Sequence, residues 1–232
     1  MEKLFLFFDL GQTLLDQSNF INFLDQKLLE LINGFGGKID FRNYITLRNN
    51  IIKNRMIGDG GIEEIIPIIC RLILPKGYDK IILKKINPFM NNGKRELYCL
   101  VKESKKVLEI LSRYCDMGII SNQTEEALEP LIQSDLLGLF KKIFISSKTK
   151  INKLDEKLFL NAIKCSGVSV NKCIMIGDRL DIDIFPANKI GLKTIRITDS
   201  LFNLQSAINK YEMPTYTVKK LDEIPNIIKG IV

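Results

Sequence analysis

The chain has 232 residues, of which 46% are hydrophobic and 26% are charged. This composition is typical of a globular protein with one large α/β domain, or with a core domain and a smaller inserted one. The chain contains no histidine, which excludes Ser-His-Asp triads, Cys-His pairs and histidine-ligated zinc. Catalysis would therefore depend on carboxylates, lysine, hydroxyl groups or a hard metal ion.

The net charge of +7 comes from lysines that are spread along the chain in short clusters. Because they form no basic face with interleaved aromatic residues, we expect a solvated surface that suits a small anionic ligand and no nucleic-acid binding. The five cysteines include no Cys-x-x-Cys pair, and their odd number fits reduced thiols in a reducing cytoplasm.

The N-terminal apolar run is too short for a signal peptide, and no stretch reaches the roughly 18 apolar residues that a membrane span needs. We therefore expect a cytoplasmic, soluble protein without a membrane partner. The sequence leaves open whether it is a monomer or a homodimer.

Short apolar runs alternate with helical periods along most of the chain. Residues 4–8 form an unbroken apolar run that ends in Asp9, which is typical of a strand buried on both faces of a parallel sheet. Residues 17–92 show helical periodicity interrupted by glycine-rich loops, and predict a helical insertion. Further strands are predicted at residues 117–121, 143–146, 173–177, 194–197 and 216–218, and helices at residues 102–114, 125–134, 155–165, 183–189 and 222–229.

This alternation predicts an α/β fold with a doubly wound parallel sheet, which is a Rossmann-like core with right-handed crossovers. We expect the core to comprise residues 1–16 and 93–232, and a helical cap to comprise residues 17–92.

Polar side chains follow the predicted strands at the points where they end. Asp9, Ser121 with Asn122, and Asp178 come directly after three strands, and Lys153 follows another by a few residues. Any one of them could be a helix cap or a solvated side chain. Because ligands of open parallel sheets bind at the carboxyl ends of the strands, their convergence predicts a site there.

Four segments in this order resemble the motifs of the haloacid dehalogenase superfamily. They are F-D-L-G-Q-T-L at residues 8–14, I-I-S-N at 119–122, K-L-D at 153–155 and G-D-R-L-D-I-D at 177–183. The helical insertion falls between the first and second segments, where members with an α-helical (C1-type) cap carry theirs. The resemblance covers residues 4 to about 197 and implies a hydrolase.

The resemblance also implies roles for individual residues. Asp9 would attack phosphorus and form an aspartyl-phosphate, and Lys153 would offset the charge that develops on the transferring group. Mg²⁺ would be held by the Asp9 carboxylate, the backbone carbonyl of Gly11 and Asp178, while Asp183 would complete the metal site by ordering a bound water or Lys153.

The phosphoryl group would be bound by Ser121, Asn122 and Lys153, and Thr13 would order the loop after the nucleophile. All of these assignments follow from the matching motif positions.

Gly11 departs from the pattern, because phosphatases of the family usually carry a second aspartate there, followed by a glycine where this chain has Gln12. Glycine cannot transfer a proton, and general acid–base catalysis is worth roughly 10²–10⁴ in rate. The enzyme could use substrates with good leaving groups, could recruit another carboxylate such as Asp16, or could hydrolyse phosphate esters poorly.

The leading hypothesis is a Mg²⁺-dependent hydrolase of a small phosphorylated or otherwise anionic metabolite that lacks the usual general acid/base aspartate. The alternatives are a metal-independent 2-haloacid dehalogenase-like hydrolase and a catalytically weak binding protein on the same fold. A signalling receiver domain would leave the helical insertion unexplained.

Overall fold

The structure is a computed structural model that describes residues 3–231, apart from the side chain at position 95. The chain separates into two compact units. The first combines the segment up to Asp16 with the segment from Cys99 onward, and the second is Gln17–Tyr98.

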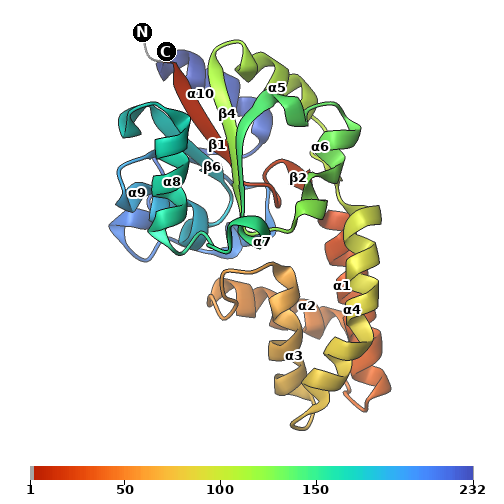
Figure 1. The fold of residues 1–232 in the computed structure, drawn as a ribbon. Coiled ribbons are helices and arrows are strands. Elements are labelled where there is room, and N and C mark those ends of the chain that lie inside the picture. The colour runs from red at the N-terminus through yellow and green to blue at the C-terminus, as the bar shows by residue number, and fades with distance from the viewer. Residues whose placement is uncertain (1–2, 232) are drawn as a thin grey trace. The chain divides into compact units, whose positions relative to one another are not determined.

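The first unit is built on a six-stranded parallel sheet with the strand order β5-β4-β1-β6-β7-β8 (Figure 1). The strands are β1 (Leu4–Phe8), β4 (Cys115–Ser121), β5 (Phe140–Ile145), β6 (Cys173–Gly177), β7 (Lys193–Ile197) and β8 (Tyr216–Val218). They coincide with the six predicted strands to within a few residues, so the predicted doubly wound α/β fold is confirmed. Because β1 pairs with β4 on one side and with β6 on the other, the direction of winding reverses at β1.

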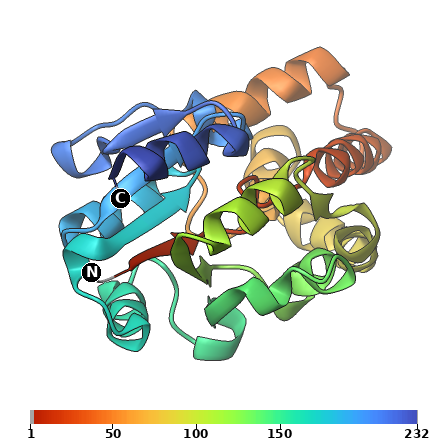
Figure 2. The same cartoon turned by 90° about the horizontal axis from the view of Figure 1, so that it is seen from above.

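Helices cover both faces of this sheet (Figures 1 and 2). They are α5 (Ser104–Ser112), α6 (Glu129–Gln133), α7 (Ser146–Thr149), α8 (Glu156–Ser166), α9 (Phe185–Lys189) and α10 (Ile224–Ile231). Phe5 and Phe7 of β1 pack with Leu158 and Phe159 of α8 and with Ala187 of α9 in one apolar cluster. Alternate residues of β1 face the other side of the sheet, and all five are buried, which explains the unbroken apolar run.

A two-stranded antiparallel ribbon lies where the chain leaves and re-enters the first unit. It pairs β2 (Leu15–Asp16) with β3 (Cys99–Leu100). Strands of two residues carry no detectable period, so the sequence gives no sign of them.

The second unit is helical, with α1 (Ser18–Gly34), α2 (Phe41–Lys53), α3 (Ile65–Ile73) and α4 (Tyr78–Leu97). The expected boundary at residues 92 and 93 lies within α4, and the compact unit ends at Tyr98. Gly93 lies inside α4, and a Cβ atom there would lie 3.3 Å from the Phe20 ring, so this glycine allows α1 and α4 to pack closely.

The second unit also buries an ion pair that the sequence does not predict. The Arg48 guanidinium and the Tyr44 hydroxyl both donate to the Asp25 carboxylate, the latter at 2.9 Å. All three side chains are buried, so the cluster links α1 to α2 inside this unit.

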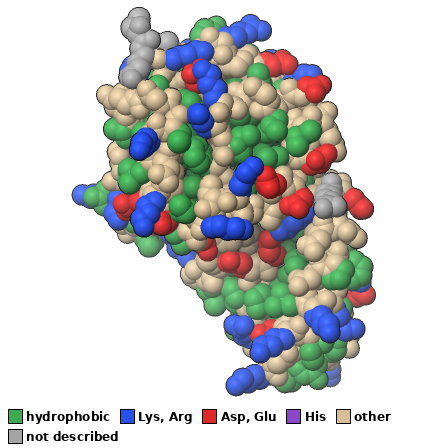
Figure 3. Space-filling view, viewed as in Figure 1, with side chains coloured by type: hydrophobic (Ala, Val, Ile, Leu, Met, Phe, Trp, Pro, Cys, Tyr) green, Lys and Arg blue, Asp and Glu red, His purple; other side chains and the backbone are tan. Residues whose placement is uncertain are grey.

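Lysine and arginine side chains are spread over the face drawn in Figure 3, among acidic and apolar ones. Within residues 3–231, none of the helices combines the length and the apolarity that crossing a bilayer would require.

Candidate active site

Asp9 lies at the carboxyl end of β1, where the winding of the sheet reverses. Its backbone N–H donates to the carbonyl of Ile176 at 2.9 Å, which fixes it against the end of β6. The residue is buried, with 10% of its side chain exposed. A carboxylate at this point of an open parallel sheet occupies the usual ligand-binding position.

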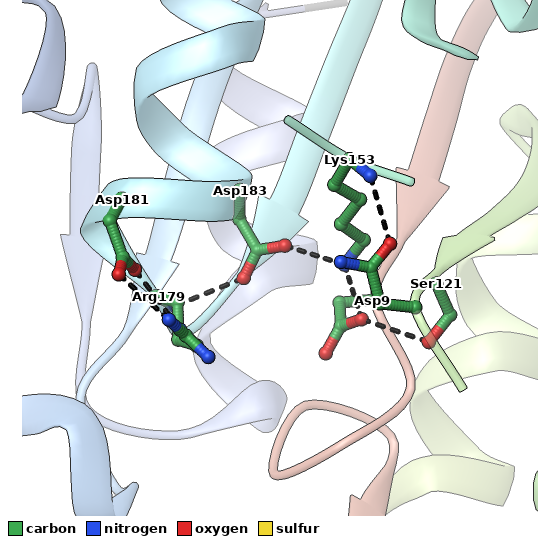
Figure 4. Close-up of polar contacts among 7 residues, drawn as sticks. Asp9, Ser121, Lys153, Arg179, Asp181 and Asp183 are labelled. Carbon is green, nitrogen blue, oxygen red and sulfur yellow. Dashed lines mark hydrogen bonds and ion pairs between the residues drawn. The ribbon is translucent and has the colours of Figure 1, made fainter. Parts of the chain in front are cut away.

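Lys153 reaches Asp9 from the segment between α7 and α8. Its ammonium group is 1% exposed and donates to Asp9 Oδ1 and, at 2.6 Å, to Asp183 Oδ1 (Figure 4). The backbone of Lys153 is anchored as well, because its N–H donates to Asn122 Oδ1 at 2.8 Å. Asn122 therefore positions the lysine, which is a contact that the sequence does not predict.

Ser121 adds a second side-chain donor to the same oxygen of Asp9. Its Oγ lies 3.2 Å from Asp9 Oδ1, and the residue is completely buried at the end of β4 (Figure 4). Since Lys153 and Ser121 both donate to Oδ1, the carboxylate cannot rotate without losing both hydrogen bonds. The orientation of Asp9 is thus fixed by residues from two other parts of the chain.

Asp178 and Asp183 enter the site from the end of β6. A π-helical turn at Leu180–Ile184 directs Asp183 back toward the strand, where its Oδ2 accepts the Arg179 N–H at 3.0 Å. A Cβ atom on Gly177 would lie 2.5 Å from the Asp183 carboxylate carbon, so only glycine permits this approach. Single π-helical turns are frequent at functional sites.

Three carboxylates therefore meet in one buried cluster. One oxygen each from Asp9, Asp178 and Asp183 lies within 4.8 Å of the others. Burial raises the pKa of Asp9, which Lys153 partly counteracts. Burial and the neighbouring carboxylates raise the pKa of Asp178 well above its ordinary value. Burial would lower the pKa of Lys153, but Asp183 and Asp9 outweigh it and raise that pKa.

The donor set fits a hard divalent cation. Carboxylate oxygens are what Mg²⁺ prefers. The three carboxylates share the ammonium group of Lys153, and the nearby Arg179 guanidinium is already paired with Asp181, so negative charge remains in excess in a medium of low dielectric constant. Both oxygens of Asp183 already accept hydrogen bonds, from Lys153 and Arg179. Asp9 and Asp178 are accordingly the better placed of the three to bind a cation directly.

The loop after β1 contains the other predicted site residues. Gly11 is buried, and its φ is not positive. Thr13 is also buried, and its Oγ1 finds no hydrogen-bond partner among the described residues. Asp16, the possible substitute acid, lies on β2, outside the carboxylate cluster.

Two polar contacts near the site were not predicted from the sequence. Ser200 Oγ donates to Asp178 Oδ2 at 2.6 Å, and Gln12 Oε1 accepts the Leu201 N–H at 2.7 Å. Ser200 follows β7 by a few residues. It could therefore have been identified as Asp9 and Ser121 were, by its position after the carboxyl end of a parallel strand.

Comparison with known proteins agrees with this geometry. A family model for haloacid dehalogenase-like hydrolases matches residues 6–191. A glyceraldehyde 3-phosphate phosphatase of Methanocaldococcus jannaschii is 25% identical over 227 residues, which cover 97% of each chain. A protein of the same name from Pyrococcus furiosus is 26% identical and covers 82% of this chain and 78% of its own.

Solved structures share the fold over nearly the whole chain. A HAD-hydrolase of Bacillus subtilis, solved bound to magnesium, is 20% identical with a TM-score of 0.69 and covers 98% of this chain and 99% of its own. A 2-haloacid dehalogenase of Pseudomonas syringae is 16% identical with a TM-score of 0.63 and full coverage of both chains. The fold alone therefore does not distinguish a magnesium-binding hydrolase from a 2-haloacid dehalogenase.

Proposed function

This chain belongs to the haloacid dehalogenase-like hydrolase family, and we propose that it is a phosphatase that hydrolyses a small phosphorylated metabolite through an aspartyl-phosphate on Asp9. The observation that carries the proposal is the buried cluster in which Lys153 joins Asp9 to Asp183, with Asp178 beside them. The phosphatase names of relatives that align over most of this chain support the same reaction.

Asp9 would supply the nucleophile. Its carboxylate oxygen would form a bond to phosphorus while the P–O bond to the alcohol breaks, and water would then hydrolyse the acyl phosphate to orthophosphate and free Asp9. Lys153 and Ser121 hold the carboxylate by Oδ1 and would remain beside the phosphoryl oxygens during the transfer. Such preorganised donors stabilise developing charge without reorganisation.

We propose that Mg²⁺ is the cofactor, held by the carboxylates of Asp9 and Asp178 and by the Gly11 carbonyl, with Asp183 orienting Lys153. When bound, the ion would neutralise the excess of carboxylate charge and polarise a phosphoryl oxygen. Without this neutralisation the cluster would repel any anionic substrate, which favours the phosphatase over a metal-independent dehalogenase.

The names of the relatives and Gly11 bear on different properties of the substrate. The archaeal relatives are named for glyceraldehyde 3-phosphate, so we propose short phosphorylated sugars as the natural class. With no carboxyl group at Gly11 to protonate the leaving oxygen, these alkyl phosphates should react more slowly than aryl phosphates, whose leaving group is already stable as an anion. The helical unit at Gln17–Tyr98 would serve as the cap that selects among the phosphorylated sugars.

Phosphate release tests the proposal, with glyceraldehyde 3-phosphate and an activated aryl phosphate as substrates and with either Mg²⁺ or a chelator present. We expect activity on both that is lost with chelator and in Asp9→Asn. The variant Asp116→Asn should keep it, because Asp116 lies near the start of β4, at the other end of the strand from Ser121, and pairs with Lys3 and Lys141.

Three results would contradict the proposal. Activity of Asp9→Asn equal to that of the natural protein would show that Asp9 is not the nucleophile. Metal-independent halide release from a 2-haloacid, without phosphatase activity, would establish the dehalogenase instead. Absence of both activities would leave a binding protein.

A further inference from the structure

The turn after β7 is fixed against the end of β6 by two buried arginines. Arg196 donates to the carbonyls of Phe202 at 3.0 Å, Gln205 at 3.4 Å and Asp178 at 3.3 Å. The Arg179 guanidinium lies 4.5 Å from the centroid of the Phe202 ring. This turn, with its 3₁₀-helical residues Leu201–Leu204, is thus a rigid support beside Asp178.

Ser200 connects this support to the carboxylate. Its Oγ accepts the Phe202 N–H at 2.9 Å as the cap of the 3₁₀ turn, and it donates to Asp178 Oδ2 at 2.6 Å. A hydroxyl has a single proton, and an ionised carboxylate can only accept. The capping bond therefore leaves the Ser200 proton directed at Asp178, which fixes how that carboxylate is turned.

Gln12 ties the same turn to the loop that follows the nucleophile. Its Oε1 accepts the Leu201 N–H at 2.7 Å. Gln12 itself has φ of 52°, a left-handed conformation that favours glycine and is costly for a residue with a Cβ atom. The strained backbone directs the side chain toward Leu201. Glycine would relieve the strain but could not make this hydrogen bond.

We propose that Ser200 and Gln12 are positioning residues for the metal-binding carboxylates. Ser200 sets the orientation of Asp178, and Gln12 fixes the turn that carries Ser200 relative to the loop that carries Asp9. The inference rests on the proposed function, because it assigns to Asp178 the direct binding of a divalent cation. Partners of this kind, which hold a metal ligand in place, typically change metal affinity by about 10–100-fold when they are removed.

Mg²⁺ binding measured by titration calorimetry tests the Ser200 step without reference to turnover. We expect Ser200→Ala to weaken Mg²⁺ binding by about tenfold or more, and Ser200→Thr to restore it because the hydroxyl is kept. Asn209→Ala is the matched control, since Asn209 caps a similar 3₁₀ turn by accepting the Tyr211 N–H at 2.9 Å. The control should lose a comparable amount of thermal stability and bind Mg²⁺ normally.

Variants of Gln12 separate two effects. Relief of the backbone strain should raise stability, whereas loss of positioning should weaken Mg²⁺ binding. Gln12→Gly should keep or raise the melting temperature while it weakens Mg²⁺ binding. Gln12→Met, which keeps the length of the side chain but has no carbonyl acceptor, should weaken binding similarly. In both variants, raising Mg²⁺ should restore kcat toward that of the natural protein.

Asp178→Asn separates failure of the proposed metal site from failure of the positioning roles. If the natural protein binds Mg²⁺ and Asp178→Asn does not, the metal assignment stands. Ser200→Ala and Gln12→Gly binding within twofold of the natural protein would then overturn the positioning roles alone. If the natural protein and Asp178→Asn show the same weak or absent binding, the metal assignment fails and the inference fails with it.

Discussion

Each of the two units buries an aspartate among charged partners, but the charges balance in only one of them. In the helical unit, Asp25 faces one guanidinium and one hydroxyl group, from Arg48 and Tyr44. In the sheet unit, three carboxylates share the ammonium group of Lys153, and the buried Arg179 guanidinium beside them is paired with a fourth carboxylate, that of Asp181. In a balanced buried pair each charge offsets the desolvation cost of the other, whereas an excess of buried charge is costly unless a further ion enters.

The number of unmatched charges distinguishes a structural ion pair from a binding site. Burial raises the pKa of Asp25 as well as that of Asp9, so a shifted pKa does not separate them. The number of unmatched charges does. The sheet unit keeps charges that the fold alone does not need, and this is typical of residues retained for chemistry.

Lys153→Met gives the largest expected effect, because it removes the ammonium group that pairs with both Asp9 and Asp183. Activity should fall on the order of 10³-fold, since a preorganised donor to the transferring group is lost. The metal-free variant should also lose about 3 kcal/mol of unfolding free energy, because the carboxylates are left uncompensated. Phosphate release and urea unfolding measure the two effects.

Lys148→Met is the control for this variant. Lys148 pairs with Glu125 at the surface, with 72% of its side chain exposed, and exposed pairs contribute little. Full activity in Lys153→Met would show that the site does not depend on the buried ammonium group.

Asp25→Ala tests the balanced cluster in the same way. It leaves the buried Arg48 without a counter-charge, so we expect a loss of about 3 kcal/mol in the free energy of urea unfolding. The double variant Asp25→Leu with Arg48→Met should recover most of it, because apolar replacements of both partners avoid the desolvation cost.

The exposed pair of Lys27 with Glu30, in the same unit, is the matched control, and Glu30→Ala should cost less than about 1 kcal/mol. A single Asp25 variant as stable as the natural protein would mean that the cluster does not hold α1 to α2.

Gly11→Asp adds a fourth carboxylate to the unbalanced cluster and supplies a possible proton donor for the leaving group. The backbone at Gly11 does not need a positive φ, so aspartate is compatible with its conformation. We expect about 10²-fold faster hydrolysis of alkyl phosphates, which have poor leaving groups, and little change with aryl phosphates.

The same variant should be less stable than the natural protein when no divalent cation is present. Equal acceleration of both substrate types would indicate an effect other than proton transfer to the leaving group.

The sequence predicts the strands and the residues at their ends because both depend on local pattern. The apolar run of β1 and the position of Asp9 directly after it are visible without any knowledge of packing. Ser121, Lys153 and Asp183 do converge on Asp9, as parallel strands require. Their roles in catalysis stay predictions until activity is measured.

What the sequence does not predict depends on contacts between distant positions. Gln12 and Leu201 are 189 positions apart, and nothing near either residue indicates the other. Likewise, Asp25 and Arg48 interrupt helical patterns whose buried faces are otherwise apolar, so their pairing appears only in three dimensions. The close approach of Gly93 in α4 to the Phe20 ring is likewise visible only in three dimensions.

Thiol labelling gives the smallest expected effect and follows the two units separately. Cys70 lies buried in the helical unit and Cys115 in the sheet unit, and burial raises the pKa of each to about 11. Since the thiolate is the reactive form, both should label slowly at pH 8 and faster as the pH rises toward 11. The exposed Cys99 and Cys165 should label faster than either, because reagent reaches them without opening of the unit.

Mg²⁺ at tenfold over its Kd should stabilise the unit that binds it by about 1.4 kcal/mol and slow the labelling of Cys115 about tenfold. Cys70 belongs to the unit without the carboxylate cluster, so its labelling should stay within twofold if the helical unit opens by itself. Mass spectrometry of the labelled peptides measures both rates in one sample. Equal protection of both cysteines would show that the two units open together, and protection of neither would show that the unbalanced charge does not attract the ion.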